Sequence, residues 1–108
     1  MLKKTKILHQ LKIRLKNAFG DIIKDVILFG SQARNEETEY SDFDVLIISE
    51  KPVTWQEKLE IRNICYDISL DFDLIIDSKI ISKIEIENNF WGKHPLITDA
   101  IKFGIHAE

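Results

Sequence analysis

Apolar residues recur along this chain at two spacings, one typical of helices and one typical of strands. Leu8, Leu11 and Leu15 lie three or four residues apart, as they would on one face of a helix. The pattern predicts an amphipathic helix over residues 3–18, and Gly20 is a suitable stop just after it. The chain therefore opens with a helix that needs an apolar surface to pack against.

Two short apolar runs follow this helix and predict buried strands. The first covers residues 26–29 and ends at Gly30, and the second covers residues 42–48. In the second run Asp42 and Asp44 alternate with apolar residues, so both carboxylates project from one face of the strand. The segment between the two runs is polar and predicts a turn and a loop.

The next part of the chain continues the alternation of helix and strand. Thr54 and Glu57 have the spacing of a capping box, which predicts a helix that starts here and runs to about residue 66. Residues 70–76 then alternate between apolar and mostly acidic side chains, so we expect a third strand there.

Two further helices are predicted after the third strand. Ser78 is a suitable N-cap for a helix that fades near Asn88. Pro95 can begin a last helix, with Gly104 just past its end. The order of elements predicts an α/β protein with a small mixed sheet of about three strands and helices packed on it. The first two strands can pair antiparallel, whereas the helix between the second and third favours a parallel pair.

Composition bounds the class of protein. The chain has 108 residues, of which 44% are hydrophobic and 31% are charged, so we expect one soluble domain covering residues 1–108. No apolar run reaches membrane-spanning length, and no signal peptide is recognisable. The lone Cys65 excludes an intramolecular disulfide and fits a reducing compartment. We therefore expect a cytoplasmic protein.

Charge is spread unevenly along the chain. The net charge is −3, but the first sixteen residues carry six Lys or Arg and no acidic residue. A protein that binds duplex nucleic acid is usually basic overall, so direct nucleic-acid binding is not expected. The basic segment is a solvated helix face or a contact for an acidic partner or a phosphate.

The paired carboxylates are the first sign of chemistry. Asp42 and Asp44 are two residues apart on a strand, which places them about 6–7 Å apart along the backbone. Carboxylate oxygens at this spacing can hold hard cations such as Mg²⁺. A two-metal site usually needs a third carboxylate from elsewhere in the fold, and Asp71 and Asp73 on the predicted third strand are the candidates. Each Asp taken alone would be an ordinary solvated residue.

The turn after the first strand is a candidate phosphate site. Gly30 lets the backbone approach a ligand closely, and the N–H groups of such a turn can bind an anion. Ser31 adds a hydroxyl donor, and Arg34 is close enough in sequence to reach a phosphate. A Gly-Ser pair alone is usually only a turn. The signal lies in its combination with the two carboxylates about a dozen residues later.

These two motifs together resemble a known family. Gly30-Ser31-x-Ala33-Arg34, followed by Ser41-Asp42-x-Asp44 and an apolar run, resembles the signature of the DNA polymerase β-like nucleotidyltransferases. Within that superfamily the chain resembles the minimal nucleotidyltransferases, small proteins often paired with a HEPN-domain partner in toxin–antitoxin systems. The resemblance implies a polymerase-β-like nucleotidyltransferase fold.

The resemblance also implies roles for individual residues. Asp42 and Asp44 would coordinate Mg²⁺, with two ions expected, and Asp73 would be the third carboxylate because it matches the apolar-Asp-apolar pattern. Asn35 departs from the glycine that family members often have after the arginine, which puts the loop shape in question. The expected nucleotide-binding residues are Gly30, Ser31, Arg34 and Ser41.

Three functions remain open at this point. The first is an antitoxin enzyme that transfers AMP from ATP to a hydroxyl, with tyrosine as the expected acceptor, on a HEPN-type toxin. The second is transfer to a small molecule such as an aminoglycoside, although such enzymes usually carry an extra helical domain. The third is a catalytically idle antitoxin that acts by binding alone. The sequence leaves the oligomeric state open, either with itself or with a partner.

Overall fold

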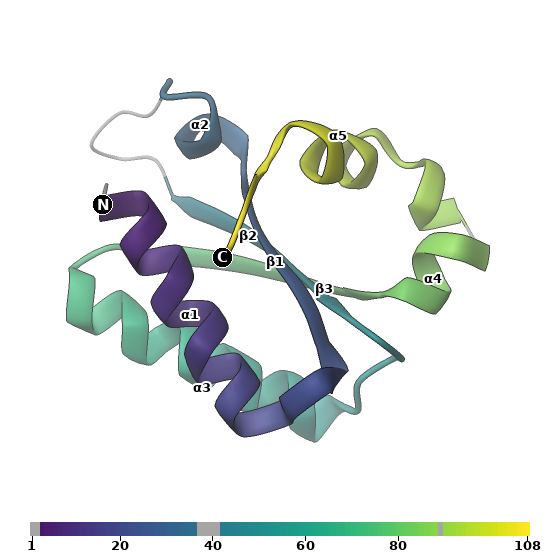
Figure 1. Cartoon of the computed structure of the whole chain (residues 1–108), viewed down its shortest axis with the longest axis horizontal. Helices are drawn as coiled ribbons and strands as arrows, with labels where there is room; N and C mark the ends of the chain where they lie inside the picture. Colours follow the sequence, from purple (N-terminus) through teal and green to yellow (C-terminus); the bar gives the residue numbers. More distant parts are fainter. Residues whose placement is uncertain (1–2, 37–41, 89) are drawn as a thin grey trace.

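The computed structural model describes residues 3–36, 42–88 and 90–108. In this part of the chain a four-stranded sheet carries helices on both faces (Figure 1). None of the helices in these ranges has the length and hydropathy that a membrane crossing requires. The helices are α1 (Lys3–Phe19), α2 (Gly30–Ala33), α3 (Trp55–Phe72), α4 (Lys83–Asn88) and α5 (Pro95–Phe103), the 3₁₀ turns are η1 (Gly20–Ile22) and η2 (Phe90–Lys93), and the strands are β1 (Ile23–Phe29), β2 (Phe43–Ser49), β3 (Ile76–Ser82) and β4 (Ile105–His106).

The sheet has the strand order β3-β2-β1-β4. β1 pairs antiparallel with β2 and with β4, and β2 pairs parallel with β3, as the connections predict. The end of β1 therefore meets the starts of β2 and β3 at one end of the sheet. In the register, Phe29 lies opposite Asp44, and Asp44 lies opposite Asp77.

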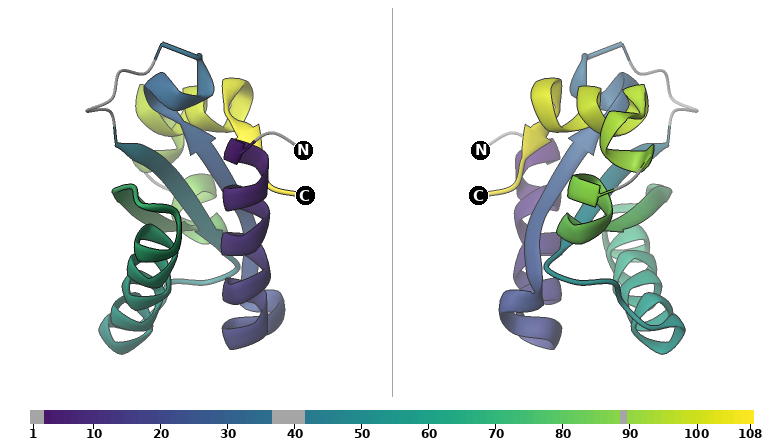
Figure 2. Two further views of the ribbon diagram at one scale, coloured as in Figure 1. Left: turned by 90° about the vertical axis from the view of Figure 1, so that its left-hand side faces the viewer. Right: turned by 90° about the vertical axis from the view of Figure 1, so that its right-hand side faces the viewer.

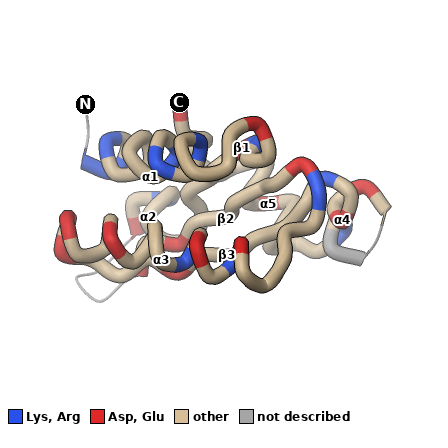
Figure 3. Tube along the Cα trace, turned by 90° about the horizontal axis from the view of Figure 1, so that it is seen from below, with Lys and Arg blue, Asp and Glu red and all other residues tan. Residues whose placement is uncertain are grey.

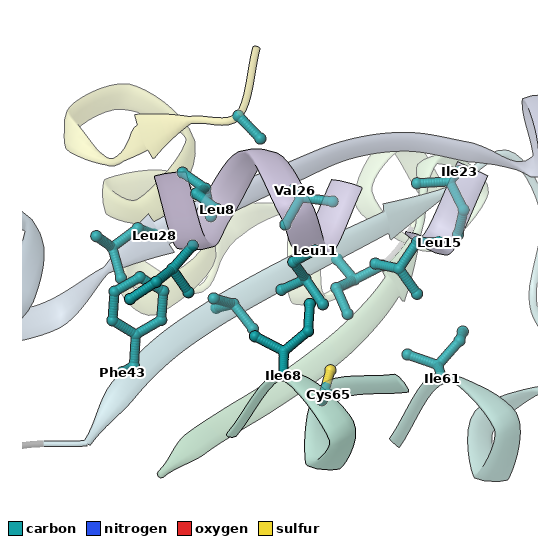
Figure 4. Packing of buried hydrophobic residues seen from close by; sticks show 14 residues of the cluster. Leu8, Leu11, Leu15, Ile23, Val26, Leu28, Phe43, Ile61, Cys65 and Ile68 are labelled. Carbon is teal, nitrogen blue, oxygen red and sulfur yellow. The ribbon is translucent and has the colours of Figure 1, made fainter. Parts of the chain in front are cut away.

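Two apolar clusters hold the helices on the sheet. The larger cluster joins α1 and α3 to one face, and Figure 4 shows Leu11 of α1 directed toward Ile68 of α3 and Leu15 of α1 on the side of Ile61 of α3. The smaller cluster joins α5 to the other face, around Leu46 and Ile97. Figure 2 shows the two layers on opposite sides of the sheet. The sheet is thus buried on both faces along most of its length.

Several sequence predictions are confirmed. The first and last predicted helices are present as α1 and α5, and the α/β class and mixed sheet are as expected. β1 begins at Ile23, three residues before the predicted start, because Ile23 is itself fully buried. The Thr54 capping box is present, with the Thr54 hydroxyl accepting the Glu57 N–H at 3.1 Å. The sheet has one strand more than expected, the two-residue β4, which is too short to leave a pattern.

The strand predicted over residues 70–76 is wrong. Its first half is the last turn of α3, and β3 begins only at Ile76. Phe72 lies seven residues after Cys65 and packs against the same cluster, so the helical period prevails over the two-residue alternation. Asp73 then ends the helix in the left-handed conformation, with φ of 53°.

The helix predicted from Ser78 is also wrong at its start, because β3 runs through this position to Ser82. Ser82 caps α4 instead, and its hydroxyl oxygen accepts the Glu85 N–H at 3.1 Å. The consecutive residues Ile80 and Ile81 suggest a helix, but each packs on a different face of the sheet. An apolar pair of this kind is what a strand covered on both faces requires.

Candidate functional site

The candidate site begins where β1 turns into α2. Gly30 occupies this turn with φ of 73°, a conformation that glycine adopts without strain. A Cβ atom at Gly30 would lie 2.5 Å from Oδ2 of Asp44 on the neighbouring strand. The backbone of the turn is therefore held directly against a carboxylate, and only glycine leaves room for it.

Asp44 is the centre of the acidic group. Its pKa is raised above the ordinary value, first by burial and then by the negative charges of Asp77 and Asp42, whereas Lys79 opposes the rise. Asp77 is the register partner of Asp44 on β3, so the two carboxylates sit on adjacent strands. The site therefore concentrates negative charge, and carboxylates this close repel one another unless a cation offsets their charge.

The acidic group suits a hard divalent cation that binds together with a phosphate ligand. Its donors are carboxylate oxygens, the ligand type that Mg²⁺ prefers. Among the described residues, no three His, Cys, Asp or Glu side chains are grouped closely enough to hold a metal ion by themselves. Mg²⁺ is usually held by one or two carboxylates together with substrate phosphates, and the pairing of Asp44 with its acidic neighbours fits that mode.

A cleft of about 980 Å³ opens beside this group, between α1, the starts of β2 and β3, and α3. Its volume is at the upper end of the range for small-molecule sites. Gly30 and Asp44 are not in its lining, and a smaller cavity of about 390 Å³ borders Gly30 and α5. Because Asp42 and Asp77 line the larger cleft, we take it as the approach to the carboxylates. Its charged lining consists of Lys3, Lys4, Arg62, Asp42, Asp73 and Asp77.

One basic residue of α1, Lys4, contacts the turn that follows β1. Figure 3 shows Lys and Arg concentrated along α1 and acidic residues along α3. The Lys4 ammonium donates to the Gln32 carbonyl at 2.9 Å and to Oδ1 of Asn35 at 3.0 Å. Asn35 has φ of 56°, so it does adopt the left-handed conformation for which a glycine is more usual. α1 thus braces the turn that carries Gly30.

The sequence-predicted residues fall into four groups. Gly30 and Asp44 are in contact distance of each other, and Asp42 immediately precedes β2. Ser31 is in the turn and partly exposed, whereas Arg34 is exposed and pairs with Glu36 at 3.1 Å. The structure places Asp73 at the end of α3, on the rim of the cleft, and not on a strand. Ser41 lies outside the described residues.

The sequence analysis did not single out Asp77. The residue lies on β3 directly opposite Asp44, where a third carboxylate was expected from the strand pattern. The alternation of Asp77, Lys79 and Ile81 on one strand face was available in the sequence. It did not identify β3, because the preceding alternation at residues 70–76 fits a strand equally well.

Comparisons with known proteins agree with this geometry. The family model described as a nucleotidyltransferase domain matches residues 8–104. A relative from Methanocaldococcus jannaschii, named as a protein adenylyltransferase, is 39% identical over 84 residues, covering 78% of this chain and 84% of the relative. A second relative of the same name and organism is 37% identical over 75 residues, covering 68% and 74%.

Solved structures share the fold at low sequence identity. A toxin–antitoxin structure with AMP-PNP gives a TM-score of 0.58 at 15% identity, covering 97% of this chain and 72% of that chain. A Shewanella oneidensis structure of a tri-AMPylated HEPN toxin in complex with an MNT antitoxin gives a TM-score of 0.51 at 13% identity, covering 94% and 70%. The mixed sheet and its helices are therefore those of the nucleotidyltransferase fold.

Proposed function

This chain belongs to the nucleotidyltransferase domain family, and we propose that it transfers AMP from ATP to a hydroxyl group on a HEPN-type toxin, acting as its antitoxin. The observation that carries the proposal is the fixed contact between the Gly30 turn and the Asp44 carboxylate. A phosphate-binding turn beside a cluster of carboxylates is the arrangement that binding of a metal–triphosphate complex needs.

The phosphates would lie along the turn. Backbone N–H groups near Gly30 and the Ser31 hydroxyl supply donors, and Arg34 can exchange Glu36 for a phosphate because its side chain is exposed. Asp42 and Asp44 would hold Mg²⁺ together with the phosphates. When bound, Mg²⁺ would neutralise phosphate charge during transfer.

The transfer itself is a displacement at the α-phosphorus. The acceptor hydroxyl oxygen forms a bond to that phosphorus, the bond to the pyrophosphate oxygen breaks, and pyrophosphate leaves. A carboxylate on the acceptor side takes the hydroxyl proton. We assign this role to Asp77 because it faces Asp44 across the strand pair and lines the cleft, with Asp73 as the alternative. The protein contributes mainly by positioning these groups.

A protein acceptor is supported by three observations. Two relatives reported above are named as protein adenylyltransferases. The structurally similar MNT antitoxin is in complex with an AMPylated HEPN toxin. The open cleft beside the carboxylates leaves room for a side chain presented by another protein. Tyrosine is the expected acceptor because its long side chain carries a hydroxyl away from the partner backbone.

The test is label transfer from α-labelled ATP to a HEPN-type toxin in the presence of Mg²⁺. We expect wild-type protein to label the toxin and the double variant Asp42→Asn, Asp44→Asn to lose labelling. Asp21→Asn is the matched control, because Asp21 is exposed in η1 just before the start of β1, whereas the site lies after the end of β1. Equal inhibition of the unlabelled toxin by wild type and double variant would show binding alone. Label moving only to a small-molecule acceptor would overturn the protein-acceptor proposal.

A second comparison distinguishes the two candidates for the third carboxylate. Asp77→Asn should lower the transfer rate by about 10²-fold or more, as expected when a general base is lost. Asp73→Asn should retain the rate, because asparagine tolerates the left-handed conformation that Asp73 adopts. The opposite result, with Asp73→Asn inactive and Asp77→Asn active, would assign the role to Asp73. Thermal unfolding of both variants shows whether each is folded.

A further inference from the structure

The outer side of α3 exposes four large side chains in a row. Trp55 is 71% exposed, Leu59 54%, Tyr66 62% and Leu70 63%. Their spacings of four, seven and four residues place them on one face of the helix, which we call the α3 stripe. Single exposed apolar residues are normal on a protein surface, but a continuous row along one helix marks an interaction site.

The Trp55 end of the α3 stripe faces away from the rest of the molecule, whereas Tyr66 and Leu70 at the other end also line the cleft of about 980 Å³. At 100° per residue, its centre lies on the side of the helix opposite the buried residues Ile61, Cys65 and Ile68. Figure 2 shows α3 at the outer edge of the molecule, with the sheet and α1 on its inner side. A second helix lying along the stripe would therefore pack on the exposed side of α3 and border the cleft at the Tyr66 and Leu70 end.

We propose that α3 pairs with α3 of a second copy of this chain, side by side and parallel, along the α3 stripe. The inference concerns assembly and is argued from the stripe alone, but it shares Tyr66 and Leu70 with the cleft through which the proposed acceptor would enter. The four exposed side chains offer on the order of 500 Å² per copy, so pairing buries about 1,000 Å² in total. That area reaches the lower limit expected of a specific protein–protein interface.

Charge determines the direction of the pair. Glu60 and Asp67 border the stripe on one side, and Arg62 borders it on the other. In an antiparallel pair with twofold symmetry, like borders meet, so Glu60 would face Asp67 of the partner subunit. In a parallel pair opposite borders meet. Arg62 then lies beside Asp67 of the partner subunit, which is five residues further along the sequence, and symmetry gives this contact twice in the dimer. Complementary borders therefore favour the parallel arrangement.

The centre of the stripe supports the same arrangement. Asn63 lies between Leu59 and Tyr66 and faces the same side of the helix. A single polar residue of this kind among apolar contacts fixes register in parallel two-helix pairs, because it is best satisfied by its own counterpart. The stripe is thus complementary to itself, which is the reason for choosing a second copy as its occupant.

The first experiment measures the dissociation constant by sedimentation equilibrium. Wild-type protein should be a dimer at micromolar concentrations, and Leu59→Glu should raise the dissociation constant by about 30-fold or more, as at an interface hot spot. Ile84→Glu is the matched control, since Ile84 is 48% exposed on α4 and outside the stripe. It should leave the dissociation constant unchanged.

The second experiment reads the direction of the pair by oxidative cross-linking. Gln56→Cys places a thiol near one end of the stripe, where parallel copies bring position 56 next to itself. In an antiparallel pair centred on Asn63 the two thiols would be about 20 Å apart and could not bond. Native Cys65 does not interfere, because burial raises its pKa to about 11. Wild-type protein should accordingly show no cross-link.

Charge exchange provides an independent check. Arg62→Glu alone should weaken the dimer, and adding Asp67→Arg should restore it, because a parallel pair keeps the two positions in contact. A wild-type monomer at all concentrations up to about 100 µM would overturn the proposal. So would a dimer that Leu59→Glu leaves intact, or a Leu59→Glu variant that loses only binding to the acceptor protein, which would assign the stripe to that partner.

Discussion

Gly30 has a positive φ and also leaves room for the Asp44 carboxylate. Gly20 has a positive φ but no such neighbour, so a comparison of the two glycines separates these effects. Gly30 and Gly20 both have positive φ, 73° and 64°, so alanine at either position should cost about 1 kcal/mol of unfolding free energy. Only at Gly30 would the new Cβ meet a carboxylate, with Oδ2 of Asp44 at 2.5 Å, whereas nothing lies within 4 Å at Gly20. Gly30→Ala should therefore lose AMP transfer, and Gly20→Ala should keep it.

The measurement combines urea unfolding with label transfer for the two variants. Retained transfer in Gly20→Ala measures the effect of backbone strain alone, and any further loss of stability and transfer in Gly30→Ala measures the effect of the contact with Asp44. Equal transfer rates in both variants would mean that the close approach at Gly30 has no role in the reaction.

The residues of the site differ in how far sequence could identify them. Gly30 and Asp44 could be found because they adjoin strands whose apolar runs are unambiguous. Asp77 could not, because two consecutive segments each place an Asp between apolar residues, and local pattern does not show which one forms the strand. The choice depends on Phe72 packing in the core as part of a helix, which is a tertiary contact.

Among the elements, β4 depends on a titratable contact. His106 places Nδ1 2.6 Å from Oδ2 of Asp25 on β1 and Nε2 2.9 Å from the Ile101 carbonyl oxygen, so both ring nitrogens face acceptors. Desolvation and the charge of Lys12 lower the pKa of His106, but its hydrogen bonds to the Ile101 carbonyl and Asp25, together with the Asp25 charge, raise it overall. The protonated ring is therefore the form that fits this position.

The raised pKa predicts a pH dependence of stability. A group whose pKa is higher in the folded state stabilises fully below its unfolded value, about 6.5 for histidine, and loses this contribution as pH rises through the folded value. Urea unfolding should show a larger difference between wild type and His106→Gln at pH 6 than at pH 9. Asp25→Asn should reduce that pH dependence. A difference that is constant over this range would contradict the assignment.

The elements show why some of the fold could be predicted and some could not. α1 has a single helical periodicity with one buried face, and β2 is a nearly continuous apolar run buried on both faces, so pattern alone identifies them. β3 contributes side chains to a cluster on each face of the sheet. Its consecutive isoleucines fit a helical pattern equally well, and only the packing of both faces identifies the strand. β4 is held by its pairing with β1 and by the Ala107 N–H donating to the Val26 carbonyl at 2.8 Å, contacts that no local pattern contains.

At the scale of the whole molecule, the two faces of the sheet are unequally covered. The cluster under α1 and α3 includes Leu11 and most of the fully buried side chains, whereas the cluster under α5 is smaller and includes Ile97. α5 also follows short elements that pack mainly on one another and on the edge of the sheet. We expect the α5 side to open locally while the other side remains folded, since local stability follows buried apolar contact.

Native-state hydrogen exchange tests this division. Backbone amides of α5 should exchange through an opening of lower free energy than those of α1, β1 and β2, which should exchange only on global unfolding. Leu11→Ala should lower the global unfolding free energy by about 2–5 kcal/mol, as expected for a fully buried leucine. Ile97→Ala should lower protection chiefly within α5. The carboxylates lie on strands that the larger cluster anchors. Near the midpoint of unfolding, Ile97→Ala should therefore retain more transfer activity than Leu11→Ala. Equal loss of activity in both variants would mean that the molecule unfolds as one unit.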